Sequence, residues 1–390
     1  MESVMMMKLK KGHFMRFLEA FSLVALLIFP GCGSFDRSHD APSAPLGELN
    51  LAQEIRATGI EKFLGQTETR KELQAEWEDF FFNPAEERAI CLFGGEYQVS
   101  IRRGASNNVL FYLQGGGACW SALTCLGGAA TETAGRSLAD GILDASRTDN
   151  PFKDWNIVFV PYCDGSVFSG DNVVQYRNAF ESRDVKTYHH GLQNLGAAMT
   201  AMQGAFPNPD KVLVAGSSAG GYGTTYGMMM AKLVFPKQSN WVLNDAGPGI
   251  QNINEVSERV QREENWPFPQ YLPASCPRCR EQPAYLFEWA LSLDPNLRVG
   301  LFSSLRDIVI RLFLLLVEGA DYEALLRQVT DDMSSRVGDR FHRFFIPGEG
   351  HTILLDPLFY EVQSNGFSMA EWTGAMVNNN DAGWPDLVPE

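Results

Sequence analysis

From Ala89 onward, short apolar segments alternate with segments of helical pattern. The apolar segments are rich in β-branched and aromatic residues, are bounded by Gly, Asn, Asp or Pro, and comprise Val109–Gln114, Asn156–Tyr162, Lys211–Gly216, Trp241–Asp245, Leu297–Ser303 and Phe341–Ile346. Helical segments lie between them, near Gly191–Gln203, Tyr222–Leu233 and Asp321–Thr330. This alternation predicts an α/β fold, with a mostly parallel sheet that helices cover on both faces. Ala89–Arg103 resembles an antiparallel hairpin that turns at Gly94-Gly95.

Two stretches interrupt the alternation, near residues 248–282 and 308–330. Insertions of this kind often form a cap over a site. Within the second stretch, the apolar run Ile308–Val317 is expected to be a buried core helix, because apolar helical segments usually pack inside. We expect residues 51–390 to form one domain that contains both insertions.

Residues 216–220 read Gly-Ser-Ser-Ala-Gly and fit the pattern G-x-S-x-G, with Ser218 at its centre. The segment KVLVAG before it has the character of a buried strand, and YGTTYGMMMAKL after Gly221 has that of a helix. Glycines allow a sharp bend between strand and helix that leaves the central hydroxyl exposed, as in α/β-hydrolases. The pattern alone is common, but this context favours Ser218 over Ser217 as a nucleophile.

A second glycine-rich turn, Gly115-Gly116-Gly117, follows the predicted strand VLFYLQ. A serine that attacks an acyl carbon needs backbone N–H groups aimed at the oxygen that becomes negative. In α/β-hydrolases they come from a glycine-rich turn and from the residue after the nucleophile, here Ala219. A phosphate-binding loop is the alternative, but neither G-x-G-x-x-G nor a following Lys-Ser/Thr pair is present.

His351 is the expected general base. In α/β-hydrolases this histidine follows the nucleophile and lies on a loop after the last strand. His351 stands in FFIPGEGHTIL, a predicted strand followed by a glycine-bracketed loop, whereas His342 lies inside that strand and is expected to be structural. His189 and His190 precede Ser218 and open a predicted helix, so we expect them at the surface or as helix caps.

Asp307 is the expected acid that orients His351, and Asp245 is the alternative. Asp245 ends the first predicted strand after Ser218, and Asp307 follows the second. The second position is the commoner one for the acid in this architecture. Ser218, His351 and Asp307 would form a Ser-His-Asp triad, whose chemistry needs neither a metal nor a cofactor.

Residues 1–32 have the pattern of an export signal, with basic residues before the apolar run Ala20–Phe29. This run is too short to span a bilayer as a helix. Its end, LIFPGC, resembles a bacterial lipoprotein signal in which the cysteine is lipidated. We therefore expect an exported cell-envelope protein with a lipid anchor at Cys32 and a polar tether over residues 33–50; the alternative is a secreted protein.

The chain has seven cysteines. With Cys32 set aside, six remain that can close three disulfides in an oxidising compartment: Cys91, Cys119, Cys125, Cys163, Cys276 and Cys279. The spacing Cys276-Pro-Arg-Cys279 also occurs in zinc sites, but no second pair stands at ligand spacing. This favours a disulfide or free thiols over a metal site.

The formal net charge of the chain is −15. An acidic surface repels phosphate backbones, and no basic cluster interrupts the acidic composition. The composition therefore argues against nucleic acid as a partner.

Four motifs, in order, resemble the pectin acetylesterase/Notum family of α/β-hydrolase carboxylesterases: VLFYLQGGGACW, WNIVFVPYCDGSVFSGD, GSSAGG and LNDAGPG. The resemblance runs from Cys91 to Gly247, and beyond that point it rests on Asp307 and His351. It implies an extracellular carboxylesterase whose triad is Ser218, Asp307 and His351, and whose oxyanion donors are the N–H groups of Gly116, Gly117 and Ala219.

The resemblance also implies contacts around the site. It suggests Trp120, Asp164 and Ser166 as substrate-binding residues, and disulfides that join Cys119 to Cys125 and Cys91 to Cys163. The chain departs from the family where relatives carry an aromatic residue beside the oxyanion glycines, because Ala118 stands there and the aromatic residue is displaced to Trp120.

The function expected from these features is hydrolysis of a short acyl ester, such as O-acetyl on a polysaccharide like pectin. A Notum-like deacylase that removes longer acyl chains from a lipid or protein is the alternative on the same machinery. An alternative of another class is a surface-anchored binding protein that keeps the fold without turnover.

Overall fold

The computed structural model describes residues 50–85, 87–136, 140–178 and 182–390. The predicted export signal, Cys32 and nearly all of the predicted tether lie outside these residues. Within the described ranges, no helix is both long enough and apolar enough to cross a membrane.

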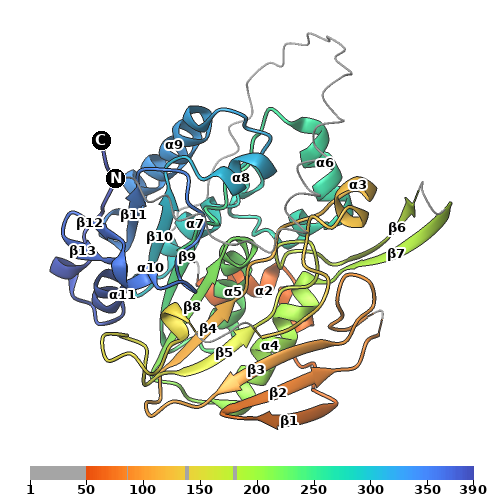
Figure 1. Ribbon diagram of the computed structural model, residues 1–390, viewed down its shortest axis with the longest axis horizontal. Helices are drawn as coiled ribbons and strands as arrows, with labels where there is room; N and C mark the ends of the chain where they lie inside the picture. The colour runs from red at the N-terminus through yellow and green to blue at the C-terminus, as the bar shows by residue number, and fades with distance from the viewer. Residues whose placement is uncertain (1–49, 86, 137–139, 179–181) are drawn as a thin grey trace, which may run out of the picture.

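A nine-stranded sheet runs through the molecule in the order β1-β2-β3-β5-β4-β8-β9-β10-β11 (Figure 1). Its first part is antiparallel and consists of β1 (Arg70–Gln74), β2 (Trp77–Phe82) and β3 (Tyr97–Arg102). The other six strands pair in parallel: β4 (Val109–Leu113), β5 (Asn156–Val160), β8 (Lys211–Ser217), β9 (Ser239–Asp245), β10 (Arg298–Ser304) and β11 (Phe341–Ile346). They correspond to the six apolar segments, so the predicted parallel sheet is confirmed.

Helices cover both faces of this sheet. Alternate residues of a strand face opposite sides, and in β4 Phe111 and Leu113 join one buried cluster while Leu110 and Tyr112 join another. The first cluster includes residues of α2 (Leu51–Ala57), α4 (Gly191–Ala205), α5 (Ala219–Val234), α7 (Tyr285–Leu293) and α9 (Gly319–Val337). The second includes residues of α10 (Leu358–Glu361) and α11 (Met369–Val377). Burial of each large apolar side chain contributes about 1.5–3 kcal/mol to folding.

The predicted hairpin over residues 89–103 is wrong. β3 pairs instead with β2, and residues 89–93 form no strand. The backbone of Leu92 is bonded elsewhere: its N–H donates to the Cys163 carbonyl at 2.7 Å, and its carbonyl accepts from the Tyr188 N–H at 2.8 Å. A local turn is still present, since the Gly94 N–H donates to the Cys91 carbonyl at 2.8 Å and the Cys91 N–H to the Gly95 carbonyl at 3.0 Å. The long-range bonds of Leu92 replace the predicted strand pairing.

The expectation of a buried core helix over residues 308–317 is also wrong. α8 (Ile308–Phe313) is short, and Ile310 is its only buried residue. Ile308 and Val317 are 37% and 80% exposed. The apolar side chains of this segment line a pocket, which explains an apolar sequence at a partly exposed position.

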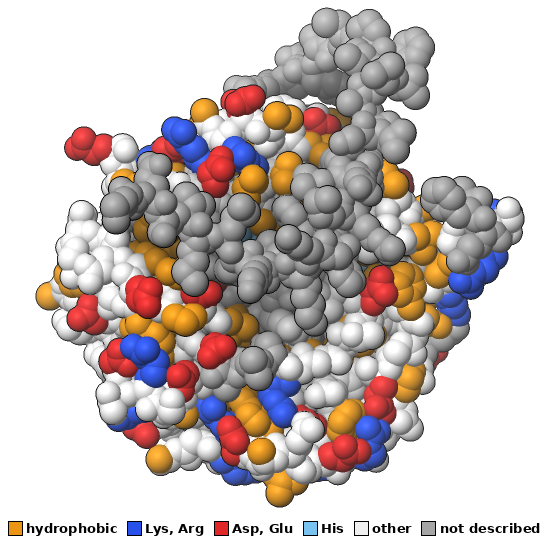
Figure 2. All heavy atoms as spheres, viewed as in Figure 1, with side chains coloured by type: hydrophobic (Ala, Val, Ile, Leu, Met, Phe, Trp, Pro, Cys, Tyr) orange, Lys and Arg blue, Asp and Glu red, His pale blue; other side chains and the backbone are white. Residues whose placement is uncertain are grey.

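Several smaller elements surround the sheet. The hairpin of β6 (Asn172–Asn178) and β7 (Arg183–His189) extends away from the body, and α3 (Ala122–Leu126) lies beside α6 (Val256–Asn265) (Figure 1). The remaining short elements are β12 (Gln363–Ser364), β13 (Phe367–Ser368), and the 3-10 turns η1 (Ile60–Phe63), η2 (Gly141–Leu143), η3 (Phe268–Tyr271), η4 (Pro277–Arg280), η5 (Gly338–Arg340) and η6 (Asp381–Gly383). Over the described part of the face in Figure 2, acidic and basic side chains are mostly interspersed.

Three disulfides join the cysteines of the described chain: Cys91–Cys163, Cys119–Cys125 and Cys276–Cys279. The two pairings implied by the family resemblance are confirmed, and Cys276 and Cys279 form a disulfide with each other. Disulfides persist in oxidising compartments, so three of them fit an exported protein.

Candidate active site

The loops that carry the predicted site residues leave the same edge of the sheet. The glycine turn follows β4, Ser218 follows β8, Asp307 follows β10, and His351 follows β11. These strands are parallel and lie within one run of neighbours, so their carboxyl ends share an edge. Ligands of open α/β sheets bind at this edge.

Ser218 occupies the bend between β8 and α5. Its φ is 58° and its ψ is −120°, a conformation that costs a non-glycine residue on the order of 1–3 kcal/mol. The Ser218 N–H donates to the Asp245 carbonyl at 2.8 Å, which helps to hold the bend. At Gly220, a Cβ atom would lie 2.0 Å from the Leu113 carbonyl, so glycine is required for α5 to approach the sheet. This is the strand–turn–helix geometry predicted around Ser218.

His351 and Asp307 are in direct contact. Asp307 is fully buried at the N-cap of α8, where Oδ1 accepts the N–H groups of Val309 and Ile310 at 2.9 and 3.0 Å. Its other oxygen, Oδ2, lies 2.7 Å from His351 Nδ1. A carboxylate only accepts hydrogen bonds, so Nδ1 carries the proton and Nε2 presents a lone pair. Among the described residues, neither His351 Nε2 nor the Ser218 hydroxyl makes a hydrogen bond.

The loops after β10 and β11 are joined along their backbones. Three N–H groups of the first loop donate to carbonyls at the end of β11 and in the second loop: Leu305 to Ile346 at 2.9 Å, Arg306 to Gly348 at 3.0 Å, and Ile308 to Glu349 at 3.2 Å. An ion pair of 3.0 Å between Arg311 and Glu349 adds a side-chain link. These contacts fix His351 relative to Asp307.

Asp245, the alternative acid, makes no hydrogen bond to His351 among the described contacts. It is fully buried, and its Oδ2 accepts from Ser217 Oγ at 2.6 Å. The same oxygen accepts the N–H groups of Ile353 and Leu354 at 3.1 and 3.0 Å. Asp245 therefore connects the bend that carries Ser218 to the loop that carries His351. Burial raises the pKa of Asp245 to about 6, and these hydrogen bonds oppose that rise.

The glycine turn after β4 packs against the Ser218 bend. A Cβ atom at Gly115 would lie 2.9 Å from the Ser218 Cβ, and one at Gly117 would lie 2.1 Å from the Ala129 carbonyl. Gly117 has a φ of +81°, which favours glycine. The N–H groups of Gly116, Gly117 and Ala219 donate to no other group in the described part of the chain.

A mostly apolar pocket opens beside Ser218. Its empty volume, counted with its open mouth, is about 870 Å³. Gly117 and Ala219 line it together with Ser218, and both predicted insertions contribute to its wall. The large apolar side chains in the wall are Trp120, Val167, Tyr222, Tyr226, Ile250, Trp266, Phe268, Leu272, Leu286, Ile310, Phe313 and Leu314.

Most of these wall residues were not predicted from the sequence. One signal was available in α5, where Tyr222, Thr225 and Tyr226 stand at helical spacing after Ser218 and face the same pocket. Residues of the 248–282 insertion carry no comparable pattern, because they come from loops and from an α6 helix with no buried residue.

Of the three predicted substrate-binding residues, only Trp120 lines the pocket. Asp164 and Ser166 are fully buried and do not line it, so their role in binding substrate stays a prediction. Asp164 Oδ1 accepts the Ser166 N–H at 2.8 Å and also accepts from the Ser166 hydroxyl. Ser166 Oγ in turn accepts the Gly170 N–H at 2.9 Å. Asp164 Oδ2 has no hydrogen-bond partner among the described residues, so only one oxygen of this carboxylate is bonded within the loop.

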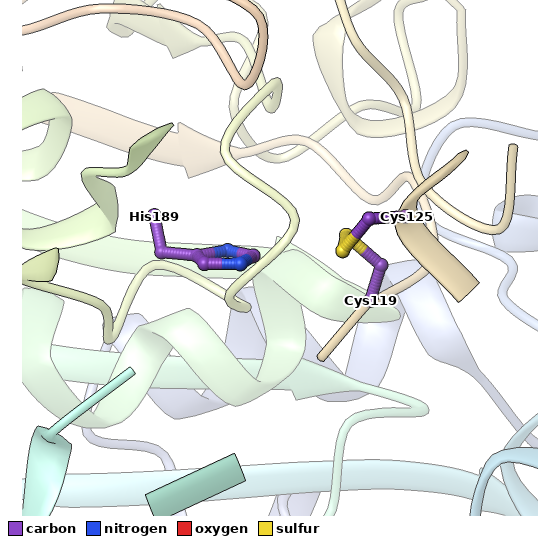
Figure 3. A group of neighbouring side chains, drawn as sticks. All are labelled: Cys119, Cys125 and His189. Carbon is purple, nitrogen blue, oxygen red and sulfur yellow. A yellow bond between two sulfur atoms is a disulfide. The ribbon is translucent and has the colours of Figure 1, made fainter. Parts of the chain in front are cut away.

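His189 lies beside the Cys119–Cys125 disulfide (Figure 3). The three side chains are close enough to resemble a metal site, but the two sulfur atoms are bonded to each other and offer no thiolate. Both ring nitrogens of His189 are engaged, with the Asp164 carbonyl and the Tyr176 hydroxyl, each at 3.1 Å. Burial lowers the pKa of His189 to about 4, so the ring is neutral at neutral pH.

The other histidines of the described residues lie away from Ser218 and Asp307. His189 and His190 are 0% and 2% exposed, and His190 makes no side-chain cap, so the expectation of surface or capping residues is wrong. His190 Nδ1 lies 2.9 Å from the Arg88 carbonyl. His342 packs on the Trp384 ring at the far end of β11, where its contacts are structural.

The Asp245 carboxyl should give the protein a distinctive dependence of stability on pH. Its pKa is about 6 in the folded protein and near its ordinary value of 3.8 in the unfolded chain. The folded state therefore binds more protons between these values, and the stabilising contribution of the protonated carboxyl is lost as pH rises through this window. In Asp245→Asn this titration is absent.

We expect the wild type to exceed Asp245→Asn in free energy of unfolding most clearly near pH 4, and the difference to shrink by on the order of 2 kcal/mol by pH 7. Urea denaturation of both proteins from pH 4 to pH 7 measures this difference, and the other carboxyls cancel because both proteins carry them. A difference that stays constant with pH would contradict the raised pKa.

Comparisons with known proteins agree with this geometry. A family model described as Pectinacetylesterase matches residues 74–264. Pectin acetylesterase 4 of Arabidopsis thaliana is 28% identical over 184 residues, which are 44% of this chain and 44% of that protein. Pectin acetylesterase 11 of the same plant is 28% identical over 171 residues, 41% of this chain and 42% of that protein. The matches thus span less than half the length of these relatives.

Among solved structures, the Wnt deacylase Notum from Drosophila is similar, with a TM-score of 0.57 and 17% sequence identity. The alignment covers 80% of this chain and 98% of that one. At this identity the likeness concerns the fold, and with the mostly parallel sheet it shows the predicted α/β-hydrolase fold. The family model, the curated relatives and the fold together support assignment of the chain to the pectin acetylesterase/Notum family.

Proposed function

We propose that this protein is a serine carboxylesterase in which Ser218, His351 and Asp307 act as the catalytic triad. The observation that carries the proposal is the 2.7 Å contact between His351 Nδ1 and Asp307 Oδ2, at the sheet edge from which strained Ser218 emerges. A buried carboxylate that holds an imidazole by Nδ1 leaves Nε2 free to act as a base.

In the proposed reaction, Ser218 Oγ attacks the acyl carbon of the ester while His351 Nε2 takes its proton. The tetrahedral intermediate collapses, the carbon–alkoxide bond breaks, and His351 returns the proton to the leaving alcohol. Water then attacks the acyl-serine with His351 again as base, which releases the carboxylic acid and restores the Ser218 hydroxyl. Asp307 stabilises the imidazolium in both steps.

The oxyanion in each step is assigned to the N–H groups of Gly116, Gly117 and Ala219. These groups have no other acceptor in the described chain, and two of the three residues line the pocket with Ser218. A donor fixed before the reaction stabilises developing charge without reorganisation, and one such donor is worth about 10²–10³ in kcat.

The proposed substrate is an O-acetyl group on a polysaccharide such as pectin. This choice is supported by the curated relatives, which are named pectin acetylesterases. An acetyl group needs little room beside Ser218, and the rest of the pocket would then contact the alcohol part of the ester.

A longer acyl chain is the second candidate, and the pocket wall favours it. Aromatic and aliphatic side chains dominate the pocket wall, and burial of each CH₂ group of a substrate against such a wall contributes about 0.8 kcal/mol. The solved structure of similar fold is named a Wnt deacylase. On this reading the enzyme would remove a lipid-like acyl group.

We also propose that the protein is exported to the cell envelope and carries a lipid anchor at Cys32. The three disulfides support an oxidising location. Labelled palmitate that fails to enter the wild type, or that enters Cys32→Ser equally, would argue for a secreted form instead.

Ser218→Ala and Asp307→Asn should both abolish most turnover while the protein stays folded. Loss of the nucleophile removes the covalent step, and the amide at position 307 leaves His351 in the wrong tautomer, so we expect kcat to fall by about 10⁴-fold or more for each. Steady-state hydrolysis of p-nitrophenyl acetate measures kcat, and circular dichroism checks the fold.

Asp245→Asn is the matched control for the acid, because it removes the other buried carboxylate at the same sheet edge. We expect it to retain far more kcat than Asp307→Asn. The opposite order would assign the acid to Asp245, and failure of a fluorophosphonate to label Ser218 in folded protein would favour a binding protein without turnover.

A series of p-nitrophenyl esters from acetate to palmitate separates the two substrates. A maximum of kcat/KM at acetate, with release of acetate from acetylated pectin or xylan, supports the polysaccharide acetylesterase. A rise of about three- to fourfold per added CH₂ up to octanoate or longer supports the second candidate, since each buried methylene adds about 0.8 kcal/mol.

A further inference from the structure

Arg262 is a charged residue of the pocket wall whose hydrogen-bonding capacity is unused. α6 carries it to the pocket that Ser218 lines. Among the described residues, its guanidinium makes neither a hydrogen bond nor an ion pair. A guanidinium has five N–H donors and no acceptor, so this part of the wall offers donors to whatever enters.

Two aromatic neighbours place the guanidinium near the reacting residues. Its Cζ lies 5.1 Å from the centre of the Trp120 ring, three residues beyond the glycine turn. Tyr222, one turn after Ser218 in α5, lines the same pocket as Arg262. The Trp120 ring covers one face of the guanidinium through a cation–π contact. The N–H groups in the plane of the guanidinium remain available as hydrogen-bond donors.

Other arginines of the same insertion have carboxylate partners. Arg259 and Arg280 pair with Glu263 at 3.5 and 2.6 Å, and Arg278 pairs with Glu288 at 3.0 Å. Glu263 and Glu258 also favour the charged form of Arg262 through space, but neither forms an ion pair with it. The carboxylate of Glu258 instead accepts from Trp120 Nε1. Arg262 therefore departs from the pattern of its own segment.

Apart from the proposed nucleophile Ser218, the other hydroxyl and amide side chains of the pocket wall are already bonded to the backbone of the protein. The acceptors are the carbonyls of Ser166 for Ser169, Tyr222 for Thr225, Ile250 for Tyr222, Phe268 for Tyr226, and Arg280 and Glu281 for Gln251. In the described wall, Arg262 is thus the charged group left for a ligand.

An unpaired cation in a mostly apolar wall is costly in the empty pocket. Burial lowers the pKa of Arg262, yet a guanidinium stays charged at neutral pH. A carboxylate in the pocket would supply the missing partner, and the planar fork matches a carboxylate through two parallel hydrogen bonds.

We propose that Arg262 is a specificity-determining residue that binds a carboxylate carried by the ester substrate. The inference rests on the proposed esterase function, because Ser218 must hydrolyse the ester that Arg262 selects. The carboxylate has two sources, the far end of the acyl chain or an acidic alcohol such as a uronic acid. Both bring the same chemistry to the same guanidinium.

Two pairs of esters of matched size test the proposal on the wild type, Arg262→Gln and Arg262→Lys. For the acyl side, mono-p-nitrophenyl glutarate is compared with neutral p-nitrophenyl pentanoate. For the alcohol side, the O-acetylated methyl glycoside of galacturonic acid is compared with its neutral methyl ester. The readout is the ratio of kcat/KM within a pair, in which a general loss of folded enzyme cancels.

We expect the wild type to prefer the carboxylate member of one pair by about 10- to 100-fold, the effect of a hydrogen bond to a charged group. Arg262→Gln should bring that ratio close to one, and Arg262→Lys should retain part of it, because lysine keeps the charge without the fork. Arg280→Gln is the matched control, since it removes an ion-paired arginine of the same insertion outside the pocket, and its ratio should equal that of the wild type.

A second measurement does not depend on turnover. Calorimetry on the Ser218→Ala protein should detect binding of glutarate or of methyl galacturonate, and the double variant with Arg262→Gln should lose it. Equal rates within both pairs for the wild type, or an unchanged ratio in Arg262→Gln, overturn the role of Arg262 while the esterase stands. Hydrolysis that persists unchanged in Ser218→Ala overturns the esterase instead, and calorimetry then decides the carboxylate site alone.

Discussion

The buried carboxylate of Asp245 is the interaction on which the arrangement of the catalytic edge depends. Its backbone carbonyl holds the strained Ser218 bend, and its side chain holds Ser217 and the backbone after His351. One residue at the end of β9 thereby ties together loops that come from β8 and β11. The 2.7 Å contact between Asp307 and His351 depends on the positions of the loops that carry them. The Asp245 carboxylate holds the loop after β11, and backbone hydrogen bonds join that loop to the loop after β10.

The parallel core could be predicted from the sequence because burial on both faces forces each strand to be apolar throughout. Val109–Leu113 and Asn156–Val160 are fully buried, and a run of apolar residues between polar turns is their direct consequence. β1 could not be predicted in this way, since all its residues are exposed. It pairs with β2 at the edge of the sheet and shows no regular spacing of apolar residues in its sequence. The predicted hairpin at 89–103 failed for a related reason, because hydrogen bonds of Leu92 to residues distant in sequence replaced the expected pairing with residues 97–102.

The site residues, like the strands, could be predicted where local sequence determines the structure and not where long-range contacts do. Ser218, the glycine turn and the Asp307–His351 pair were found because each needs a specific backbone geometry that constrains local sequence. The burial of His189 could not be predicted in this way, because its ring is held by the Asp164 carbonyl and the Tyr176 hydroxyl, which the local sequence does not encode. Arg262 gave no signal at all. Its position depends on how α6 docks against Trp120, which no local pattern encodes.

The way α6 is attached has a consequence for how such an enzyme changes during evolution. The helix buries none of its own residues and is held mainly by polar contacts to Trp120 and its neighbour. Glu258 accepts from Trp120 Nε1, Asn265 donates to the Trp120 carbonyl, and Trp266 donates to the Cys119 carbonyl. Its pocket-facing residues are therefore largely uncoupled from the packed interior. Mutation can exchange them with little penalty in folding, while the chemistry stays protected in the sheet. Related chains can thus diverge in what they cleave and keep the same way of cleaving it.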